Sequence, residues 1–531
     1  MYKNKKPSAF KVFFNTFFTS IYPVRSETIA NMKLKHFNLL LPAMSSVVMF
    51  LIICIFSVPS VSFAALMPFL ISIFRCSKFK DFLKSSAVFF FIYYSLSFSF
   101  LFKLYEILDI SKALGIILSI LSVILLSLIT SIIHILPTLV FFRFSKGRIV
   151  DCFCYSLLFT LGEYLVSIIP ILGFPIATVS LSVCGLSSFL QISSLFGSLF
   201  ITFIIVLING LFACALITRI ISLKSLTSVL LAFLIFLSNI IYGTIRLNMP
   251  QDADGGTLTA AAVQIDKSGL EKWKVTSPLS LYKKEISKIG DVDMIFLPET
   301  AITTSIESKG VEYSINRIVN STNAELLTGI FYKNDGKSYN AYCSFANDKT
   351  NTYLKSILVP FGEFSFFSDT LFDGTKSLSS ADKIQPLKAE NALVCVGICI
   401  ESIYPTIIRK QVKSGGEVIA VPTNDSWFPD TFLQKLHFRH SILRSVENNR
   451  YLVRSANSGI SAIISPKGEV ISSISEGKTG YVKAEISKIT KNTFYTKTGN
   501  LWIIISFLVY VYMLFINFKQ TCRIRFFKLD F

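Results

Sequence analysis

The chain carries little charge for its length and few residues that bind metals. Asp, Glu, Lys and Arg make up 16% of its 531 residues, and there are only four His. Two of them, His437 and His440, stand one helical turn apart on an expected helix, but no cysteine pair accompanies them. Structural zinc takes four Cys or His ligands, so we expect no metal centre.

The cysteines do not form a disulfide framework. Of the ten, only Cys343, Cys395 and Cys399 fall in the part of the chain that has the composition of a soluble domain. Cys76 and Cys522 lie in segments expected on the cytoplasmic side, and the others lie in or beside apolar runs, where a thiol fills space as a small apolar group. The sequence therefore predicts no fold held by disulfides.

No phosphate-binding signature accompanies the net charge of +19. Many of the basic residues flank apolar runs instead of gathering on one face: Lys3, Lys5, Lys6, Lys33 and Lys35 at the start, and Lys519, Arg523, Arg525 and Lys528 at the end. That distribution is typical of loops on the cytoplasmic side of a membrane. We therefore expect no nucleic-acid partner.

Long apolar runs dominate the first half of the chain. Hydrophobic residues make up 52% of the sequence and the mean hydropathy is +0.57, values that require part of the chain to face lipid. A helix needs about 20 apolar residues to cross the hydrocarbon core. We expect eight spans, near residues 37–57, 60–74, 85–102, 113–141, 152–172, 188–218, 226–246 and 501–518.

Basic residues between the runs set the expected orientation. They follow the second, fourth and sixth spans: Arg75, Lys78, Lys80 and Lys84, then Arg143, Lys146 and Arg148, then Arg219 and Lys224. Both termini should therefore be cytoplasmic. The expected parts are a cytoplasmic segment 1–36, a membrane domain of seven helices 37–246, an outer domain 247–498, an eighth span 499–518 and a cytoplasmic tail 519–531.

Glu163 is the clearest charged residue within a span. A carboxylate at membrane depth is costly and is often functional. The alternative is that it lies near the outer interface, hydrogen-bonded between helices. The scarcity of such groups argues against a transporter.

The outer domain alternates strands and helices. Expected strands cover 257–265, 294–297, 326–332, 338–346, 391–398 and 417–422, and an expected helix covers 431–449. Residues 451–465 and 469–474 should form a hairpin that turns at Pro466-Lys467-Gly468. This pattern predicts an α/β or layered α+β domain.

Three segments place reactive side chains at expected strand ends. Glu299 and Cys399 follow apolar strands, and Lys355 precedes the segment 356–363. Side chains at strand ends can converge on a cleft. A reactive thiol needs a base to remove its proton and a cation to stabilise the thiolate. Cys395, on the same strand as Cys399, is expected in the core.

These segments resemble the nitrilase superfamily, which uses a Glu–Lys–Cys triad, and more closely the apolipoprotein N-acyltransferase family. Each motif is weak alone, but their order and spacing are specific. The matching segments are Gly162-Glu163-Tyr164, Gly173-Phe174-Pro175, Val263-Gln264 with Trp273, Leu297–Thr300, Leu358–Glu363, Cys399-Ile400-Glu401, Asn424–Phe428, Arg444, Glu447, Arg450, Arg454–Ser461 and Lys497–Asn500.

The resemblance implies a multi-span α-helical membrane domain and an extracytoplasmic, nitrilase-like αββα sandwich. It implies Cys399 as nucleophile, Glu299 as general base and Lys355 as the cation for thiolate and oxyanion. Residues expected to support these or to position substrate are Glu363, Glu401, Trp273, Trp427 and Asn424. The family usually has Tyr where this chain has Ile400, so substrate positioning should differ.

The activity implied by the resemblance joins two membrane-bound substrates. An acyl chain would pass from a phospholipid to Cys399, and then to the α-amine of the diacylglyceryl-cysteine that begins an apolipoprotein. No cofactor is needed. The expected location is the bacterial inner membrane, with the catalytic domain on the periplasmic face, and the expected state is a monomer.

Two other functions remain open at this point. One is a membrane-tethered carbon–nitrogen hydrolase of the amidase or nitrilase type, which the triad alone does not exclude. The other is a receptor or transporter with an inactive outer domain. A membrane domain of many spans argues against the first, and an intact triad argues against the second.

Overall fold

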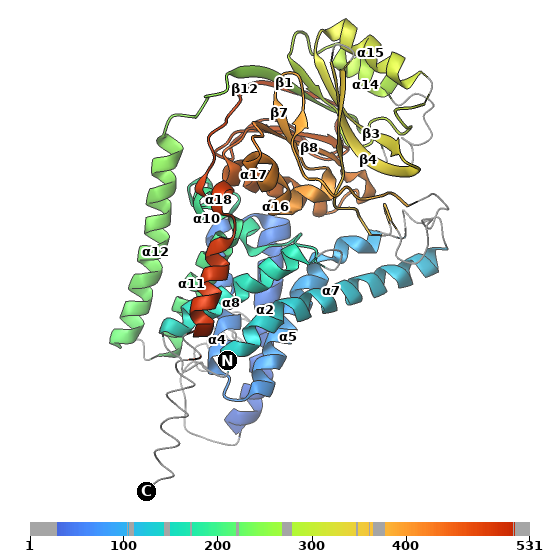
Figure 1. The fold of residues 1–531 in the computed structure, drawn as a ribbon. Coiled ribbons are helices and arrows are strands. Elements are labelled where there is room, and N and C mark those ends of the chain that lie inside the picture. Colours follow the sequence, from blue (N-terminus) through green and yellow to red (C-terminus); the bar gives the residue numbers. More distant parts are fainter. Residues whose placement is uncertain are drawn as a thin grey trace, which may run out of the picture.

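The computed structural model describes residues 29–103, 105, 111–142, 149–169, 173–218, 222–267, 279–308, 310–346, 349–360, 362–364, 377–512 and 515. Apolar helices form the lower part of the molecule, and a domain with two β-sheets lies above them (Figure 1). The two parts meet through α17 (Leu433–Asn448) of the upper domain.

The lower part consists of helices with mostly apolar sequences. Their bounds are α2 (Ile29–Phe50), η1 (Leu51–Phe56), η2 (Pro59–Val61), α3 (Ser62–Ala65), α4 (Met67–Arg75), α5 (Phe79–Ser97), η3 (Ser99–Lys103), α7 (Lys112–Phe142), α8 (Ile149–Ile168), η4 (Val179–Val183), α9 (Ser187–Leu190), α10 (Ser193–Phe196), α11 (Ser198–Ile217) and α12 (Leu223–Asn248).

Within the described residues, five helices are long and apolar enough to cross a membrane: Leu39–Phe56, Lys112–Phe142, Ile149–Ile168, Ser198–Ile217 and Leu223–Asn248. Two apolar helices are shorter, Pro59–Arg75 and Leu501–Tyr512. The expected span near 85–102 corresponds to α5 and η3. The chain is therefore a membrane protein, and the count of eight crossings stays a prediction.

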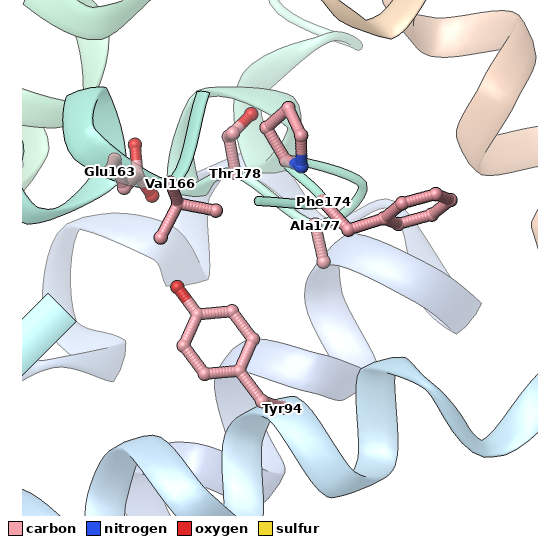
Figure 2. A pocket seen from close by; sticks show the side chains of 7 residues that line it. Tyr94, Glu163, Val166, Phe174, Ala177 and Thr178 are labelled. Atoms are coloured by element: carbon pink, nitrogen blue, oxygen red, sulfur yellow. The ribbon is translucent and has the colours of Figure 1, made fainter. Parts of the chain in front are cut away.

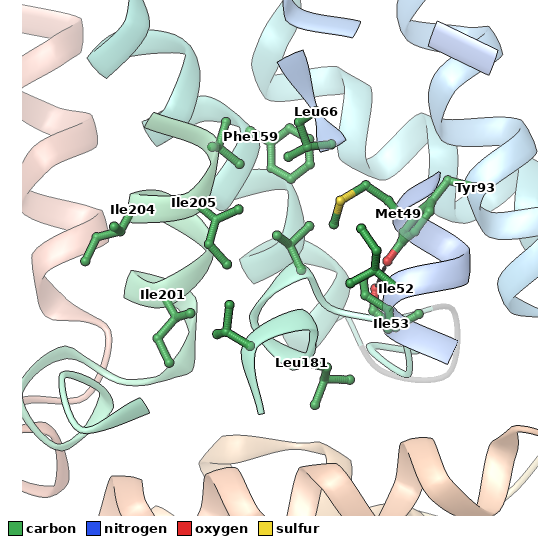
Figure 3. Close-up of a cluster of buried hydrophobic side chains, with 14 of the residues drawn as sticks. Met49, Ile52, Ile53, Leu66, Tyr93, Phe159, Leu181, Ile201, Ile204 and Ile205 are labelled. Atoms are coloured by element: carbon green, nitrogen blue, oxygen red, sulfur yellow. Dashed lines mark hydrogen bonds between the residues drawn. The ribbon is translucent and has the colours of Figure 1, made fainter. Parts of the chain in front are cut away.

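Side chains on the two faces of these helices have different surroundings. Met49, Ile53, Leu66 and Ile205 are buried in one apolar cluster between the helices (Figure 3). Large apolar side chains along α7 and α12 are exposed instead, among them Ile117, Leu121, Leu125, Leu230, Phe233 and Leu234. An exposed apolar surface of this extent requires lipid around it.

The expected span 188–218 is not one helix, and this part of the prediction is wrong. Two short helices, α9 and α10, precede α11, and the chain turns between α10 and α11 at Gly197 with φ of 79°. A Cβ atom on Gly197 would lie 2.5 Å from the Tyr495 ring. The turn therefore depends on glycine both for its backbone angle and for its packing.

Among its described residues, the upper domain contains twelve strands in two six-stranded sheets. Its strands are β1 (Thr257–Gln264), β2 (Met294–Phe296), β3 (Glu325–Asn334), β4 (Lys337–Ala346), β5 (Lys349–Leu354), β6 (Leu387–Lys388), β7 (Leu393–Val396), β8 (Val418–Asn424), β9 (Leu452–Asn457), β10 (Ser461–Ile464), β11 (Val470–Ile474) and β12 (Gly480–Ser487). The sheet orders are β12-β1-β2-β3-β4-β5 and β11-β10-β9-β8-β7-β6.

Each sheet is covered by helices on its outer face. The remaining helices are α14 (Leu279–Ile286), α15 (Val311–Thr322), η5 (Cys399–Ile403), α16 (Pro405–Lys413), η6 (Asp425–Trp427) and α18 (Phe494–Thr498). In β1, Ala261 and Val263 pack toward α14 and α15, whereas Ala260 and Ala262 pack toward the second sheet. With α16 and α17 beyond that sheet, the domain is the expected αββα sandwich (Figure 1).

The sequence located most strands correctly. The strands expected from 257–265 to 417–422 correspond to β1, β2, β3, β4, β7 and β8, and the turn at 466–468 joins β10 to β11. The prediction that residues 451–465 form one strand of a hairpin is wrong. These residues form β9 and β10, which pair antiparallel across a turn at Ser458, whose φ is 56°.

A loop of the helical part, residues 173–179, lies against the upper domain. The Tyr404 hydroxyl donates to the Gly173 carbonyl at 2.8 Å, and His440 Nε2 donates to the Ile176 carbonyl at 2.9 Å. Glu163 accepts hydrogen bonds from the Val179 amide at 2.8 Å and from a threonine hydroxyl of α11 at 2.7 Å. Glu163 borders a small cavity beside this loop, as Figure 2 shows. The carboxylate is thus hydrogen-bonded between helices, as the alternative interpretation expected.

Candidate active site

The three reactive side chains predicted from the sequence follow strands of both sheets. Glu299 follows β2 and Lys355 follows β5 in the first sheet, while Cys399 follows β7 in the second. Gly329 of β3 allows the turn at Glu299 to approach, because a Cβ atom there would lie 2.3 Å from the Thr300 amide nitrogen. The structure places all three in one electrostatic cluster.

Lys355 is held between two carboxylates. Its Nζ lies 2.9 Å from Glu299 Oε1 and 2.9 Å from Glu363 Oε1, and its side chain is 1% exposed. Burial alone would lower the pKa of Lys355, but the charges of Glu299 and Glu363 outweigh burial and raise that pKa above its usual value. The lysine therefore stays cationic at neutral pH.

Both carboxylates have further donors. Asn340 Nδ2 donates to Glu299 Oε1 at 2.8 Å and to Glu363 Oε1 at 2.7 Å. The Asn424 amide donates to Glu299 Oε2 at 3.0 Å, and the Val359 amide donates to Glu363 Oε2 at 2.8 Å. Because every carboxylate oxygen has a partner, the position of Lys355 relative to Glu299 is fixed before substrate arrives.

Cys399 is the first residue of η5, which begins shortly after β7 ends at Val396. The φ of Cys399 is 50°, a left-handed conformation that costs free energy for a residue with a side chain. Burial, followed by the Glu299 charge, raises the pKa of its thiol, while Lys355 and a hydrogen bond with Thr423 act in the opposite direction without reversing the shift. The resting thiol is therefore protonated at neutral pH, and a base must remove its proton before it can attack.

Glu401 joins the loop that carries Lys355 to the turn that carries Cys399. Its Oε1 accepts from the Ser356 amide and hydroxyl, both at 2.7 Å, and from the Ile357 amide at 3.2 Å. Its Oε2 accepts from the Ile398 amide at 2.9 Å. Glu401 is fully buried, so it supports the site through the backbone of these two loops.

The other residues expected to support the site have different positions. The backbone N–H of Asn424 donates to Glu299. Its side-chain Oδ1 accepts from the Ser426 hydroxyl at 2.6 Å, a contact that stabilises the local turn. Trp427 is half-buried at the end of η6. Trp273 lies outside the described residues.

Ile400, which stands where the resembling family has Tyr, packs in apolar surroundings. It is 6% exposed and belongs to the same buried cluster as Ile52 and Leu66 of the helical part. One apolar cluster therefore runs from the membrane helices to the residue beside the nucleophile.

Several contacts of the site could not be derived from the sequence. Asn340 and Thr423 carried no motif, and His437 was considered only as a metal ligand. In the structure His437 lies between the Cys399 carbonyl and the carboxylate of Asp425. The only signal for these contacts in the sequence was position. Asp425 lies in the matching segment Asn424–Phe428, and His437 lies between that segment and Arg444. Among the described residues, no three His, Cys, Asp or Glu side chains gather so as to hold a metal ion.

Two family models match the chain. The model for the apolipoprotein N-acyltransferase N-terminal domain matches residues 45–211, and the model for carbon-nitrogen hydrolases matches residues 259–491. The first covers most of the helical part, and the second covers β1 to β12. The candidate site lies within the second match.

Curated relatives agree with both models. An apolipoprotein N-acyltransferase of Pseudomonas aeruginosa is 29% identical over 44% of this chain and 48% of its own length. One of Coxiella burnetii is 28% identical over 70% of this chain and 79% of its own length. The match thus spans about half of the Pseudomonas relative and more of the Coxiella one.

A yeast structure, Saccharomyces cerevisiae Nit3 of branch 10 of the nitrilase superfamily, is 17% identical with a TM-score of 0.35 over 45% of this chain and 93% of that one. A likeness at that level adds nothing to the assignment, which rests on the two family models and the curated relatives. On these matches, the chain belongs to the apolipoprotein N-acyltransferase family, the membrane-bound branch of the nitrilase superfamily.

Proposed function

We propose that this protein transfers a fatty acyl chain from a phospholipid to the α-amine of an N-terminal diacylglyceryl-cysteine, through a thioester on Cys399. The observation that supports this best is a thiol on a strained turn, beside a lysine that two carboxylates hold in place. The curated relatives carry the name of this activity.

In the first half-reaction, the Cys399 sulfur attacks the ester carbonyl of the phospholipid while Glu299 takes the thiol proton. The tetrahedral oxyanion gains stabilisation from the Lys355 ammonium, which needs no reorganisation because Glu299 and Glu363 already fix it. The carbon–oxygen ester bond breaks, and the proton on Glu299 passes to the departing alkoxide. A thioester and a lysophospholipid result.

In the second half-reaction, the amine of the acceptor attacks the thioester carbonyl. Glu299 removes a proton from the amine, the carbon–sulfur bond breaks, and the thiolate regains a proton as the amide forms. The reaction uses no metal or cofactor. Because the two substrates react in turn at one cysteine, ping-pong kinetics should follow.

The helical part packs against the residues around the proposed nucleophile. The apolar cluster is continuous from the membrane helices to Ile400, next to the nucleophile. Both proposed substrates carry acyl chains, so a site open toward the bilayer avoids exposing those chains to water. A hydrolase of small soluble amides would not need this continuity.

We place the catalytic domain on the periplasmic face of the bacterial inner membrane, with both termini in the cytoplasm and the protein as a monomer. The support is the clustering of basic residues after alternate apolar runs. Labelling of single cysteines introduced at exposed sites in intact cells, for example Glu485→Cys on β12 in a background lacking reactive thiols, tests this orientation.

A transfer assay tests the function. Purified protein is mixed in detergent with phosphatidylethanolamine and a synthetic diacylglyceryl-cysteine peptide, beside a Cys399→Ala variant. We expect the peptide to gain one acyl mass only with the intact protein. Release of ammonia from a small amide, without acylated peptide, would instead support the tethered hydrolase.

A further inference from the structure

Two side chains hold the backbone carbonyl of Cys399. The Ser402 hydroxyl donates to it at 2.8 Å, and His437 Nε2 lies 3.0 Å from the same oxygen. Nε2 also lies 2.8 Å from the Ser402 hydroxyl oxygen. A carbonyl can only accept, so the ring bonds it directly in the form that carries a proton on Nε2. Because Cys399 has a left-handed φ, contacts of this kind are what keep its turn in a costly conformation.

The imidazole ring is itself fixed from its other side. Its Nδ1 lies 2.9 Å from Asp425 Oδ1, and Asp425 Oδ2 accepts from Arg454 at 2.7 Å. Gly459 lets the carboxylate lie in this position, since a Cβ atom on that residue would be 2.3 Å from Asp425 Oδ2. The side chains of His437, Asp425 and Arg454 are at most 6% exposed.

The same network reaches the thiol. Thr423 donates from its hydroxyl to Asp425 Oδ1 at 2.9 Å, and Thr423 is among the groups that lower the pKa of the Cys399 thiol. Asp425 is thus linked to the Cys399 carbonyl through His437 and to Thr423 near the thiol. The carbonyl and the Ile400 N–H share one peptide plane, so holding the carbonyl also fixes the direction of that amide.

We propose that His437 is a positioning residue of the proposed transfer. Oriented by Asp425 and Arg454, it holds the Cys399 carbonyl and keeps the thiol directed toward Glu299 and Lys355. The acyl-transfer part of this inference rests on the proposed function. Its effect on the reactivity of Cys399 does not, because a small alkylating reagent reports the geometry of the thiol without any lipid.

Two conservative variants separate positioning from simple packing. In His437→Gln the amide nitrogen takes the place of Nε2 and can still donate to the Cys399 carbonyl. In His437→Asn the amide nitrogen takes the place of Nδ1, so it can contact Asp425 but falls short of that carbonyl. The two readouts are the rate of Cys399 alkylation by iodoacetamide, mapped by peptide mass spectrometry, and the rate of acyl-enzyme formation from phosphatidylethanolamine.

We expect His437→Ala and His437→Asn to slow both reactions by about 10-fold to 100-fold, the cost of misplacing a reacting group. The phospholipid concentration at half-saturation should stay unchanged, because His437 does not contact the lipid. His437→Gln should restore most of the rate. Lys435→Ala, on an exposed face of the same helix, is the matched control and should react like the unmodified protein.

Folded Asn and Ala variants that react at the unmodified rate would overturn the proposal, as would a folded Gln variant as slow as Asn. If His437→Gln does not fold, Asp425→Asn decides. It preserves volume and removes a charge that raises the pKa of the Cys399 thiol, so slower alkylation supports positioning, and an unchanged or faster rate contradicts the proposal. If even the unmodified protein forms no acyl-enzyme, the proposed function fails, and the alkylation rates still test His437.

Discussion

Glu401 Oε1 accepts two hydrogen bonds from Ser356, one from its amide and one from its hydroxyl, each at 2.7 Å. Ser356 follows Lys355 in the chain, and the Glu401 carboxylate also accepts from the amide of the residue before Cys399. Burial raises the pKa of Glu401, and the hydrogen bonds from Ser356 oppose that shift. One buried side chain thus fixes the separation of the cation from the nucleophile.

Replacing Glu401 by Gln should weaken both the fold and the reaction. The amide nitrogen of Gln would face donors, so at least one buried donor loses its partner, at a cost of about 1–3 kcal/mol. Chemical denaturation in detergent measures the stability, and acyl-enzyme formation measures the rate. Glu485→Gln, exposed on β12, is the control. Equal stability and rate in the two variants would show that Glu401 does not hold the loops.

Removing the Lys355 charge should leave Glu299 and Glu363 facing one another without a cation. Lys355→Met is expected to lower the free energy of unfolding by about 3–5 kcal/mol, the usual cost of an uncompensated buried charge, and to abolish acylation. Because the pKa of Lys355 is raised in the fold, its stabilisation is complete at neutral pH and is lost only as pH rises above its usual value. Chemical denaturation of Lys355→Met and of the unmodified protein at pH 7 measures this loss of stability, and equal free energies of unfolding would contradict it.

The double variant Lys355→Met with Glu363→Gln separates folding from chemistry. Removing one of the two facing carboxylates should recover a large part of the stability lost in Lys355→Met. Acylation should stay absent, since no cation remains beside the oxyanion. A double variant that regains acylation would mean that Lys355 acts only through the fold.

The pH dependence of Cys399 alkylation should report a protonated resting thiol. Because the pKa of Cys399 lies above its usual value, the thiolate fraction should increase with pH from 7 to 9 without levelling off. Lys355→Met removes a charge that lowers this pKa, so it should slow alkylation further at each pH. A plateau below pH 8 would show a thiolate already formed in the resting protein.

Glu163 should stabilise the loop that contacts the catalytic domain. In Glu163→Ala the buried Val179 amide loses its acceptor, which should cost about 1–3 kcal/mol. Glu163→Gln keeps one acceptor oxygen and should cost less. Thermal unfolding of the two variants in the same detergent shows which is less stable. Equal melting temperatures would contradict this role.

Most strands could be predicted because they depend on local sequence, and apolar runs end just before Glu299 and Cys399. Lys355 follows β5, which has no apolar run, so the three residues were identified together only by their resemblance to a known family. Hydropathy could not resolve 188–218, because it registers burial without distinguishing lipid from protein. Phe189 and Leu190 of α9 are buried by other parts of the chain, whereas much of α12 is exposed.

The supporting network could not be predicted because it depends on how the sheets meet. Asn340 lies on β4, yet it contacts carboxylates that follow β2 and β5. Arg454 lies in the expected hairpin strand 451–465, but nothing in the sequence named Asp425 as its partner. Only the packed structure brings Arg454 to Asp425.

The most direct test of the account is the mass of the protein after incubation with phosphatidylethanolamine. We predict a gain of one acyl chain, mapped to the peptide containing Cys399, released by hydroxylamine and absent from Cys399→Ala. A folded protein that gains no acyl mass, or gains it equally in Cys399→Ala, would contradict transfer through a Cys399 thioester.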